Sequence, residues 1–584
     1  MSAPGQKDKF TPELRILVAS LLSFGVIILW AKFFGPKPPV QPTQANRPAQ
    51  TAPATPGAAT TPAANPPQAT ASPATMAPAA ASVAVKNDSQ ERAIVVENSL
   101  YRVELSNRGA VMKSWQLKNY KDDAKPQRVL DVVHPDGSQQ TGGWPFSVVL
   151  DDEQLQAAAN GGLYQLSPSA TALQAPAEVE LTWSDGHLEV TKHFHFDHTY
   201  VIRVETSVKL NGRPITAGLG WLGGFGDLTV TNPAPVETVS TYYSEGGKVS
   251  TFLHKKLDGL DKWGPGLWQG GKDFVGIEDR YFTAAFLPAS GATAGALETR
   301  YWKASRTVKV DGQDTLEPVP QVAAATSTQP VALRVYVGPK DYDDLKKMNP
   351  PLHGLINFGW LEFVSEPMFH GLKWLHKYIP NWGWAIVVLT LVISILFLPL
   401  RISSYKTTLK MQRVAPEIKA IQEKYKKYKF NDPRKQEMQK ETMAIYSREG
   451  INPVGGCLPM LLQMPLWIGL NRTLSYAIEM RHAQWLWIAD LSSKDPYYIL
   501  PVLMGLSMYM VSKMTPMTAT DPQQQAMMKF MPLTMAGMFV IFPWSSGLAA
   551  YILTSNVVSI AQQWYLNRTH PVPVPAKPVR GKKS

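Results

Sequence analysis

An apolar segment with a polar residue inside it most constrains what this chain can form. Residues Asn452–Trp467 read NPVGGCLPMLLQMPLW, a Pro/Gly loop that leads into a helix expected over Leu458–Tyr476. An apolar helix of this length approaches the thickness of a bilayer. Gln463 lies well inside it, and a polar side chain at membrane depth is costly unless it faces protein or water. The segment therefore predicts either a functional site at Gln463 or a hydrogen bond to a neighbouring helix.

Three further blocks accompany this segment in a fixed order. They read NWGWAIVVLTLVISILFLPL at 381–400, DPYYILPVLMG at 495–505 and TDPQQQAMMKFMPL at 520–533. Together the four blocks closely resemble the signature of the YidC/Oxa/Alb family of membrane protein insertases. The large domain before them resembles the periplasmic region of bacterial members. The resemblance implies a β-supersandwich similar to sugar-binding folds, a groove open to the cytoplasm, and action alone or with the Sec translocon. It also implies dependence on a cytoplasmic helical hairpin.

The net charge of +12 follows the pattern of a membrane topology. Segments 1–15, 401–450, 513–529 and 567–584 carry +1, +7, +1 and +5 from their Lys, Arg, Asp and Glu residues, which leaves −2 for the rest. Alternate membrane spans would place these four segments on one side. The distribution therefore indicates positive-inside topology and argues against a nucleic-acid surface. The single cysteine, Cys457, excludes an intramolecular disulfide framework.

The N-terminal region predicts a membrane anchor and a tether. Residues Ile16–Ala31 are apolar and follow a mildly basic start, so a cleaved signal peptide competes with an uncleaved signal anchor. Extension to position 34 and the lack of an adjacent small-residue cleavage site favour the anchor. Residues 35–86 are rich in Pro, Ala, Thr and Gln and cannot bury enough apolar surface to order themselves.

Residues 87–345 predict a large antiparallel β-sandwich. In Tyr200–Leu210 apolar and polar residues alternate with the period of a half-buried strand. Asp185-Gly186 predicts a hairpin turn between Glu178–Ser184 and Leu188–Phe196. A run of such strands without a long helical period is typical of a sandwich.

Two patterns in the β region suggest sites that the context does not support. His193 and His195 lie two residues apart with His198 nearby, but the sequence fixes no third metal ligand, so a solvated strand face is the better interpretation. Gly266–Lys272 has the spacing of a phosphate-binding loop. Asp273, however, stands where that loop needs Ser or Thr, and no strand–loop–helix setting surrounds it.

The second half predicts an interfacial helix, a hairpin and membrane spans. The amphipathic segment 355–380, interrupted by Pro367, suits a helix in the membrane interface, although an ordinary core helix competes. The segment Ser403–Gly450 contains 12 Lys and Arg residues but only 6 Asp and Glu residues. Its apolar residues from Met411 to Tyr428 repeat at heptad spacing, so the segment predicts a basic helical hairpin. The predicted order is a signal anchor (1–34), a linker (35–86), a periplasmic β-sandwich (87–345), an interfacial helix (355–380), a second span (381–402), a cytoplasmic hairpin (403–450), four further spans (451–566, at about 458–476, 499–514, 527–542 and 547–564) and a basic cytoplasmic tail (567–584).

Polar residues inside these spans predict a water-containing groove. The position that matches the family's intramembrane arginine is Ser394, so either Arg401 or Arg472 could supply the positive charge; for Arg401, snorkelling to the cytoplasmic surface competes. The candidate groove residues are Thr390, Ser394, Arg401, Gln463, Arg472, Thr534, Tyr551 and Asn556.

These features predict a protein that inserts and helps to fold new inner-membrane proteins. No acid/base pair, metal motif or intact phosphate loop is present, so we expect no enzymatic reaction, cofactor or metal. The expected partners are nascent membrane proteins, the Sec translocon, the bilayer and, through the hairpin and tail, the ribosome. A solute channel or secondary transporter is the alternative, but the inverted repeats of a transporter are not seen. An anchored periplasmic glycan-binding protein would leave the later spans unexplained.

Overall fold

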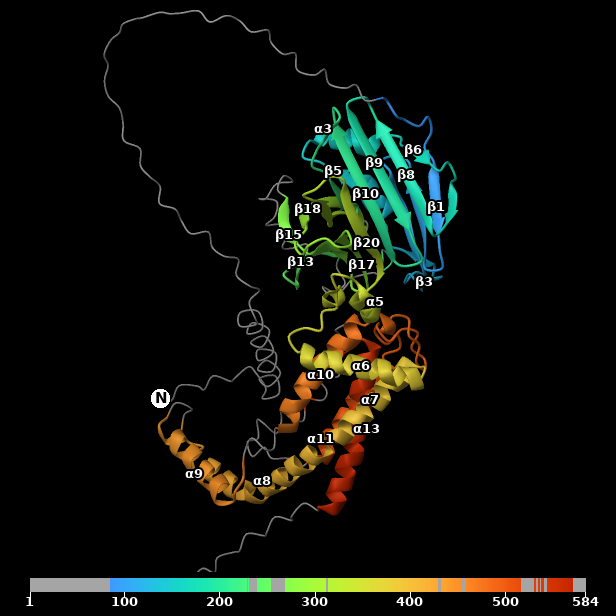
Figure 1. Cartoon of the computed structure of the whole chain (residues 1–584). Helices are drawn as coiled ribbons and strands as arrows, with labels where there is room; N and C mark the ends of the chain where they lie inside the picture. Colours follow the sequence, from blue (N-terminus) through green and yellow to red (C-terminus); the bar gives the residue numbers. More distant parts are fainter. Residues whose placement is uncertain are drawn as a thin grey trace, which may run out of the picture. The chain divides into compact units, whose positions relative to one another are not determined.

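The computed structural model describes a β domain followed by helices (Figure 1). The described residues are 84–227, 229, 239–253, 268–310, 313–428, 432–452, 458–515, 530–531, 534–535, 537–539 and 544–570. The predicted anchor, nearly all of the linker, most of the fifth span, Cys457 and most of the C-terminal tail lie outside these residues.

The β domain contains three sheets. Their strand orders are β4-β3-β2-β1-β7, β14-β13-β16-β17-β20-β10-β9-β8-β6 with β11 beside β10, and β15-β18-β19-β12-β5. The pairings are antiparallel except for β1 with β7, which is parallel. The predicted antiparallel sandwich agrees with the other described pairings and fails at this pair, where a long excursion of the chain separates the two strands. The strands are β1 (Ala93–Glu97), β2 (Tyr101–Ser106), β3 (Val111–Lys121), β4 (Val129–Asp131), β5 (Ser147–Val149), β6 (Gln165–Ser167), β7 (Ala172–Gln174), β8 (Ala177–Ser184), β9 (Leu188–Phe196), β10 (Val201–Leu210), β11 (Arg213–Pro214), β12 (Gly218–Trp221), β13 (Ser240–Glu245), β14 (Lys248–Leu253), β15 (Gln269–Lys272), β16 (Phe274–Glu278), β17 (Phe282–Pro288), β18 (Leu297–Val310), β19 (Gln313–Thr326) and β20 (Val331–Pro339).

The largest sheet contains the hairpin that the sequence predicts. Strands β8 and β9 pair in register from Ser184 opposite Glu189, and Gly186 takes the positive φ of 98° that the turn requires. In β10 the side chains of Ile202 and Val204 are buried, whereas Arg203 between them is exposed. The alternation along the sequence therefore located the buried face correctly.

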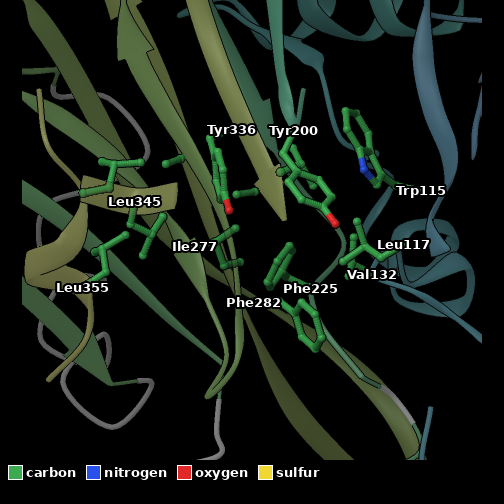
Figure 2. Close-up of a cluster of buried hydrophobic side chains, with 14 of the residues drawn as sticks. Trp115, Leu117, Val132, Tyr200, Phe225, Ile277, Phe282, Tyr336, Leu345 and Leu355 are labelled. Carbon is green, nitrogen blue, oxygen red and sulfur yellow. The ribbon is translucent and has the colours of Figure 1, made fainter. Parts of the chain in front are cut away.

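Aromatic side chains fill the interior of the β domain. Phe146 lies among several rings, with centroids 5.8 Å from Phe194 and 6.1 Å from Trp221. Trp115, Tyr200 and other labelled side chains of this core appear in Figure 2. Short helices of this domain are α2 (Pro135–Thr141), α3 (Glu153–Gly161), α5 (Tyr342–Lys347) and the 3-10 helix η2 (His353–Leu355).

Helix α6 (Glu362–Tyr378) is amphipathic, as predicted for residues 355–380. Phe369 and Leu372 are buried, whereas Phe363 and Tyr378 are 75% and 71% exposed. The predicted interruption at Pro367 is wrong, because α6 continues through it. Pro367 removes one backbone hydrogen bond and crowds the Phe363 carbonyl, but it does not end the helix.

Helix α7 (Trp382–Leu396) begins at the Asn381 cap and ends earlier than the predicted span. Helix α8 (Leu398–Lys424) follows after Phe397 at an angle of 56°. Pro399 explains the break, because it has no N–H to bond the Ile395 carbonyl four residues earlier and its ring crowds that carbonyl. Among the described residues, the length and hydropathy needed to cross a membrane are met by this bent pair together and by no single helix.

Helices α8 and α9 (Arg434–Arg448) form the predicted hairpin (Figure 1). Val414 and Ile418 of the predicted seam pack with Ile445 and Ile451. The remaining described helices are α10 (Leu458–Tyr476), the 3-10 helix η4 (Ile478–Met480), α11 (Ile499–Met514) and α13 (Ser546–Thr569).

Candidate functional site

Polar side chains of α13 join it to four other helices. α13 packs against α7 and α11 along most of its length and meets α10 as well. Its sequence places a polar residue on nearly every turn, and these side chains point to different partners. The polar residues of α13 that make contacts across helices are Tyr551, Asn556, Gln562 and Asn567.

Gln463 of α10 and Tyr551 of α13 form the first contact. The Gln463 amide donates to the Tyr551 hydroxyl at 2.8 Å. Tyr551 is buried, whereas Gln463 remains exposed in the protein. Gln463 therefore joins two helices and also presents polar surface.

Asn556 forms the second contact, one and a half turns further along α13. Its amide donates to Ser507 Oγ of α11 at 3.0 Å. Near the end of the helix, the Asn567 amide donates to the Met514 carbonyl at 3.2 Å, and Tyr405 of α8 donates to Asn567 Oδ1 at 2.7 Å. Asn567 therefore connects α13 with both α11 and α8.

Gln562 brings Ser394 and Arg401 together. Arg401 donates through Nη1 to Gln562 Oε1, and the Gln562 amide donates to the Ser394 carbonyl at 3.4 Å. One side chain, that of Gln562, thus connects the guanidinium of Arg401 with the backbone of Ser394. Because the break at Phe397 redirects the chain between them, sequence spacing alone could not show this proximity.

Thr390 and Arg472 each donate a hydrogen bond within their own helix. Thr390 is buried and donates to the Ile386 carbonyl of its own helix at 2.7 Å. Arg472 lies near the other end of α10, where it donates to Tyr476 and adjoins Gly359. Thr534 is exposed.

Sequence reasoning missed several contacting residues. Ser507, Gln562, Asn567 and Tyr405 were not singled out, although the repeated polar positions along α13 were a signal for two of them. Their partners are up to 168 residues away in the chain, so only the packing of helices identifies them.

A separate cavity of about 600 Å³ adjoins the β domain. Its lining includes Lys248, Arg280, Lys340, Glu362 and Tyr476. Lys340 forms an ion pair with the buried Glu278 at 3.1 Å. The lining therefore contains residues of both charges, and the charge of Lys340 is neutralised.

The two patterns in the β domain have local partners. His195 and His193 both face Glu178, at 3.1 and 3.8 Å, and the described residues contain no group of three or more His, Cys, Asp or Glu suited to a metal. Residues Gln269–Lys272 form strand β15, and Lys272 pairs with Glu245 at 2.6 Å. This part of the apparent phosphate loop is therefore a strand.

The fold and these contacts define a two-part protein, in which a β domain precedes helices joined by buried and half-buried polar side chains. Residues 93–371 match the family model of the YidC periplasmic domain, and residues 374–573 match that of the 60Kd inner membrane protein. The chain belongs to the YidC family of membrane protein insertases. It is an inner membrane protein with a periplasmic domain, and it acts on membrane proteins.

Individual relatives cover nearly the whole chain. A membrane protein insertase YidC of Syntrophus aciditrophicus is 32% identical, over 95% of this chain and 99% of the relative. One of Citrifermentans bemidjiense is 36% identical, over 95% and 99%. A crystal structure of an active YidC insertase with its first transmembrane domain resolved covers 83% of this chain and 95% of its own, at 17% identity and a TM-score of 0.34.

Proposed function

We propose that this insertase lowers the barrier to insertion by receiving the polar flank of its substrate in a hydrated groove beside α13. The observation that carries the proposal is the convergence of polar side chains from α8, α10 and α11, and of the Ser394 carbonyl of α7, on this one helix. Polar groups inside a membrane are retained where they face protein or water. Gln463, which is exposed while bonded to Tyr551, would line the groove.

The energetics of insertion explain why such a groove suffices. A substrate helix of about 20 apolar residues gains roughly 6–12 kcal/mol on entering lipid, at about 0.3–0.6 kcal/mol per residue. Each charge in its flank meets a barrier of at least about 2.5–3.5 kcal/mol at the membrane centre. The overall transfer is therefore favourable but obstructed. A groove that shortens the route through hydrocarbon needs no nucleotide hydrolysis and no covalent reaction.

Other segments fit the same mechanism. The exposed aromatic side chains of α6 suit burial in the membrane interface, with Trp374 57% and Tyr378 71% exposed. The basic hairpin of α8 and α9 would receive ribosomes or substrates on the cytoplasmic side. The insertase would act alone or with the Sec translocon, with its N- and C-termini in the cytoplasm.

Reconstitution tests the function directly. Purified chain in liposomes should insert a small single-span substrate, measured by protease protection, in the absence of ATP. Empty liposomes provide the background rate. Insertion that requires ATP, or that does not exceed the background, would contradict the proposal.

Arg401 is the residue that we propose supplies the groove's positive charge. Arg401→Ala should lower the initial insertion rate about tenfold, which corresponds to about 1.4 kcal/mol in the barrier. Arg472→Ala removes an equal charge from the outer end of α10 and should change the rate by less than about twofold. If both variants insert at the native rate, the positive charge has no role in this member of the family.

A further inference from the structure

The segment that follows α10 is attached to the β domain by a buried ion pair. Arg481 donates through Nη2 to Asp227, and the same nitrogen lies 3.4 Å from Asp123 Oδ1. The side chains of Arg481 and Asp227 are only 5% and 4% exposed. Removing one partner of a buried pair leaves the other charge uncompensated, so the two sides resist separation.

Neighbouring contacts reinforce this attachment. His482 Nε2 lies 2.8 Å from Asp123 Oδ1, and Arg280 of the β domain donates to the Ser475 carbonyl at 2.6 Å. The Arg481 guanidinium also lies 5.2 Å from the centre of the Phe282 ring. Burial alone would raise the pKa of Asp123, but the hydrogen bond from His482 and the charge of Arg481 hold it below its usual range. Asp123 is therefore ionised at neutral pH.

The last turn of α10 and the segment after it also contact α6. Thr473 donates to the Ser365 carbonyl at 2.9 Å, and Lys373 lies 3.2 Å from Glu479. Residues 473–482 are thus held by the β domain through one set of contacts and by α6 through another.

These contacts fix the position of the outer end of α10. Because α10 is one helix from Leu458 to Tyr476, its outer end and Gln463 are connected by about 20 Å of helix at 1.5 Å per residue. A helix held at one end cannot slide along its axis without breaking the buried pair. The position of the Gln463–Tyr551 contact therefore depends on the β domain.

We propose that Arg481 is a positioning residue for insertion: its ion pairs with Asp227 and Asp123 brace α10 against the β domain and fix the depth of Gln463. This inference rests on the proposed role of the groove. It gives the β domain a mechanical function that does not require the β domain to bind substrate.

Charge exchange in the full-length protein tests the brace. Arg481→Asp and Asp227→Arg should each lower the initial insertion rate about tenfold, a typical size for coupling between sites, and the double variant should recover at least half of the native rate. Arg102→Glu reverses a charge in the exposed pair with Glu97, which is 4.0 Å long, and should leave the rate unchanged. A native rate for Arg481→Asp, or a double variant no faster than either single variant, would overturn the inference.

A cross-link separates positioning from folding. In a Cys457→Ala background, Asp227→Cys and Arg481→Cys should insert slowly and recover when the two thiols are joined by a short bis-maleimide. If joining the thiols gives no recovery, the brace is refuted. This test still applies if Arg481→Asp does not accumulate in the cell. Failure of the brace is distinguishable from failure of the groove. A native insertion rate for Arg481→Asp together with a lower insertion rate for Arg401→Ala overturns only the brace. A native insertion rate for Arg401→Ala counts against the proposed positive charge of the groove.

Discussion

Lys192 shows how one buried residue can control the stability of the β domain. It is fully buried, and its ammonium donates to three backbone carbonyls, those of Gly109, Ala110 and Phe146, at 2.7–3.0 Å. The three acceptors match the three N–H groups of the ammonium. Burial nevertheless lowers the pKa of Lys192 to about 7.

This pKa predicts that stability rises with pH. Between pH about 7 and about 10.4, the usual pKa of lysine, the unfolded chain binds more protons at this position than the folded chain, so the free energy of unfolding increases. Below pH 7 both states carry the proton and the slope from this group disappears. Thermal unfolding of the β domain, followed by tryptophan fluorescence, should show this rise in the native protein. Lys192→Met should reduce the slope, and parallel pH profiles for the two proteins would refute the assignment.

At the scale of single elements, local sequence predicted features that depend on a few consecutive residues. The Asp185-Gly186 turn and the alternation in β10 were predictable because both depend on a few consecutive residues. The end of α7 was not predicted, because the predicted span continues to residue 402 whereas α7 ends at Leu396. The parallel pairing of β1 with β7 was not predicted either, since nothing near either strand specifies its partner.

Asn381 is an element-scale case in which a cap also connects two segments. Its side chain accepts from the Trp384 amide at the start of α7 at 3.2 Å and donates to the Gln484 carbonyl at 3.0 Å. Asn381→Ala loses both bonds and should cost about 1–2 kcal/mol of the free energy of unfolding. Asn381→Asp keeps the cap and loses only the bond to Gln484. Melting temperatures should therefore fall in the order Asn, Asp, Ala; equal values for Asp and Ala would mean that the cap contributes nothing.

At the scale of the whole molecule, the proposed groove mechanism predicts that the membrane potential acts on the substrate rather than on the protein. A potential of 100 mV contributes about 2.3 kcal/mol per charge moved across the bilayer, with the sign set by that charge. With the cytoplasmic side negative, an acidic flank that moves outward should insert faster and a basic flank more slowly.

Proteoliposomes with an imposed potassium diffusion potential can measure this effect. Three substrates that differ only in a flank with one added Asp, no added charge or one added Lys should separate in rate when the potential is applied and converge when it is dissipated. The same response of all three would show that the potential acts on the insertase itself.

The sequence by itself determined the two-part organisation, the basic hairpin, the turn between β8 and β9, the alternation in β10 and the family, because these depend on composition, short-range periodicity and ordered motifs. Only the tertiary structure decided which polar residues meet. Gln463 with Tyr551, Arg401 with Gln562 and Arg481 with Asp227 are separated by 88, 161 and 254 residues. Contacts at such separations arise when packed helices and sheets bring side chains together, and no local pattern encodes them.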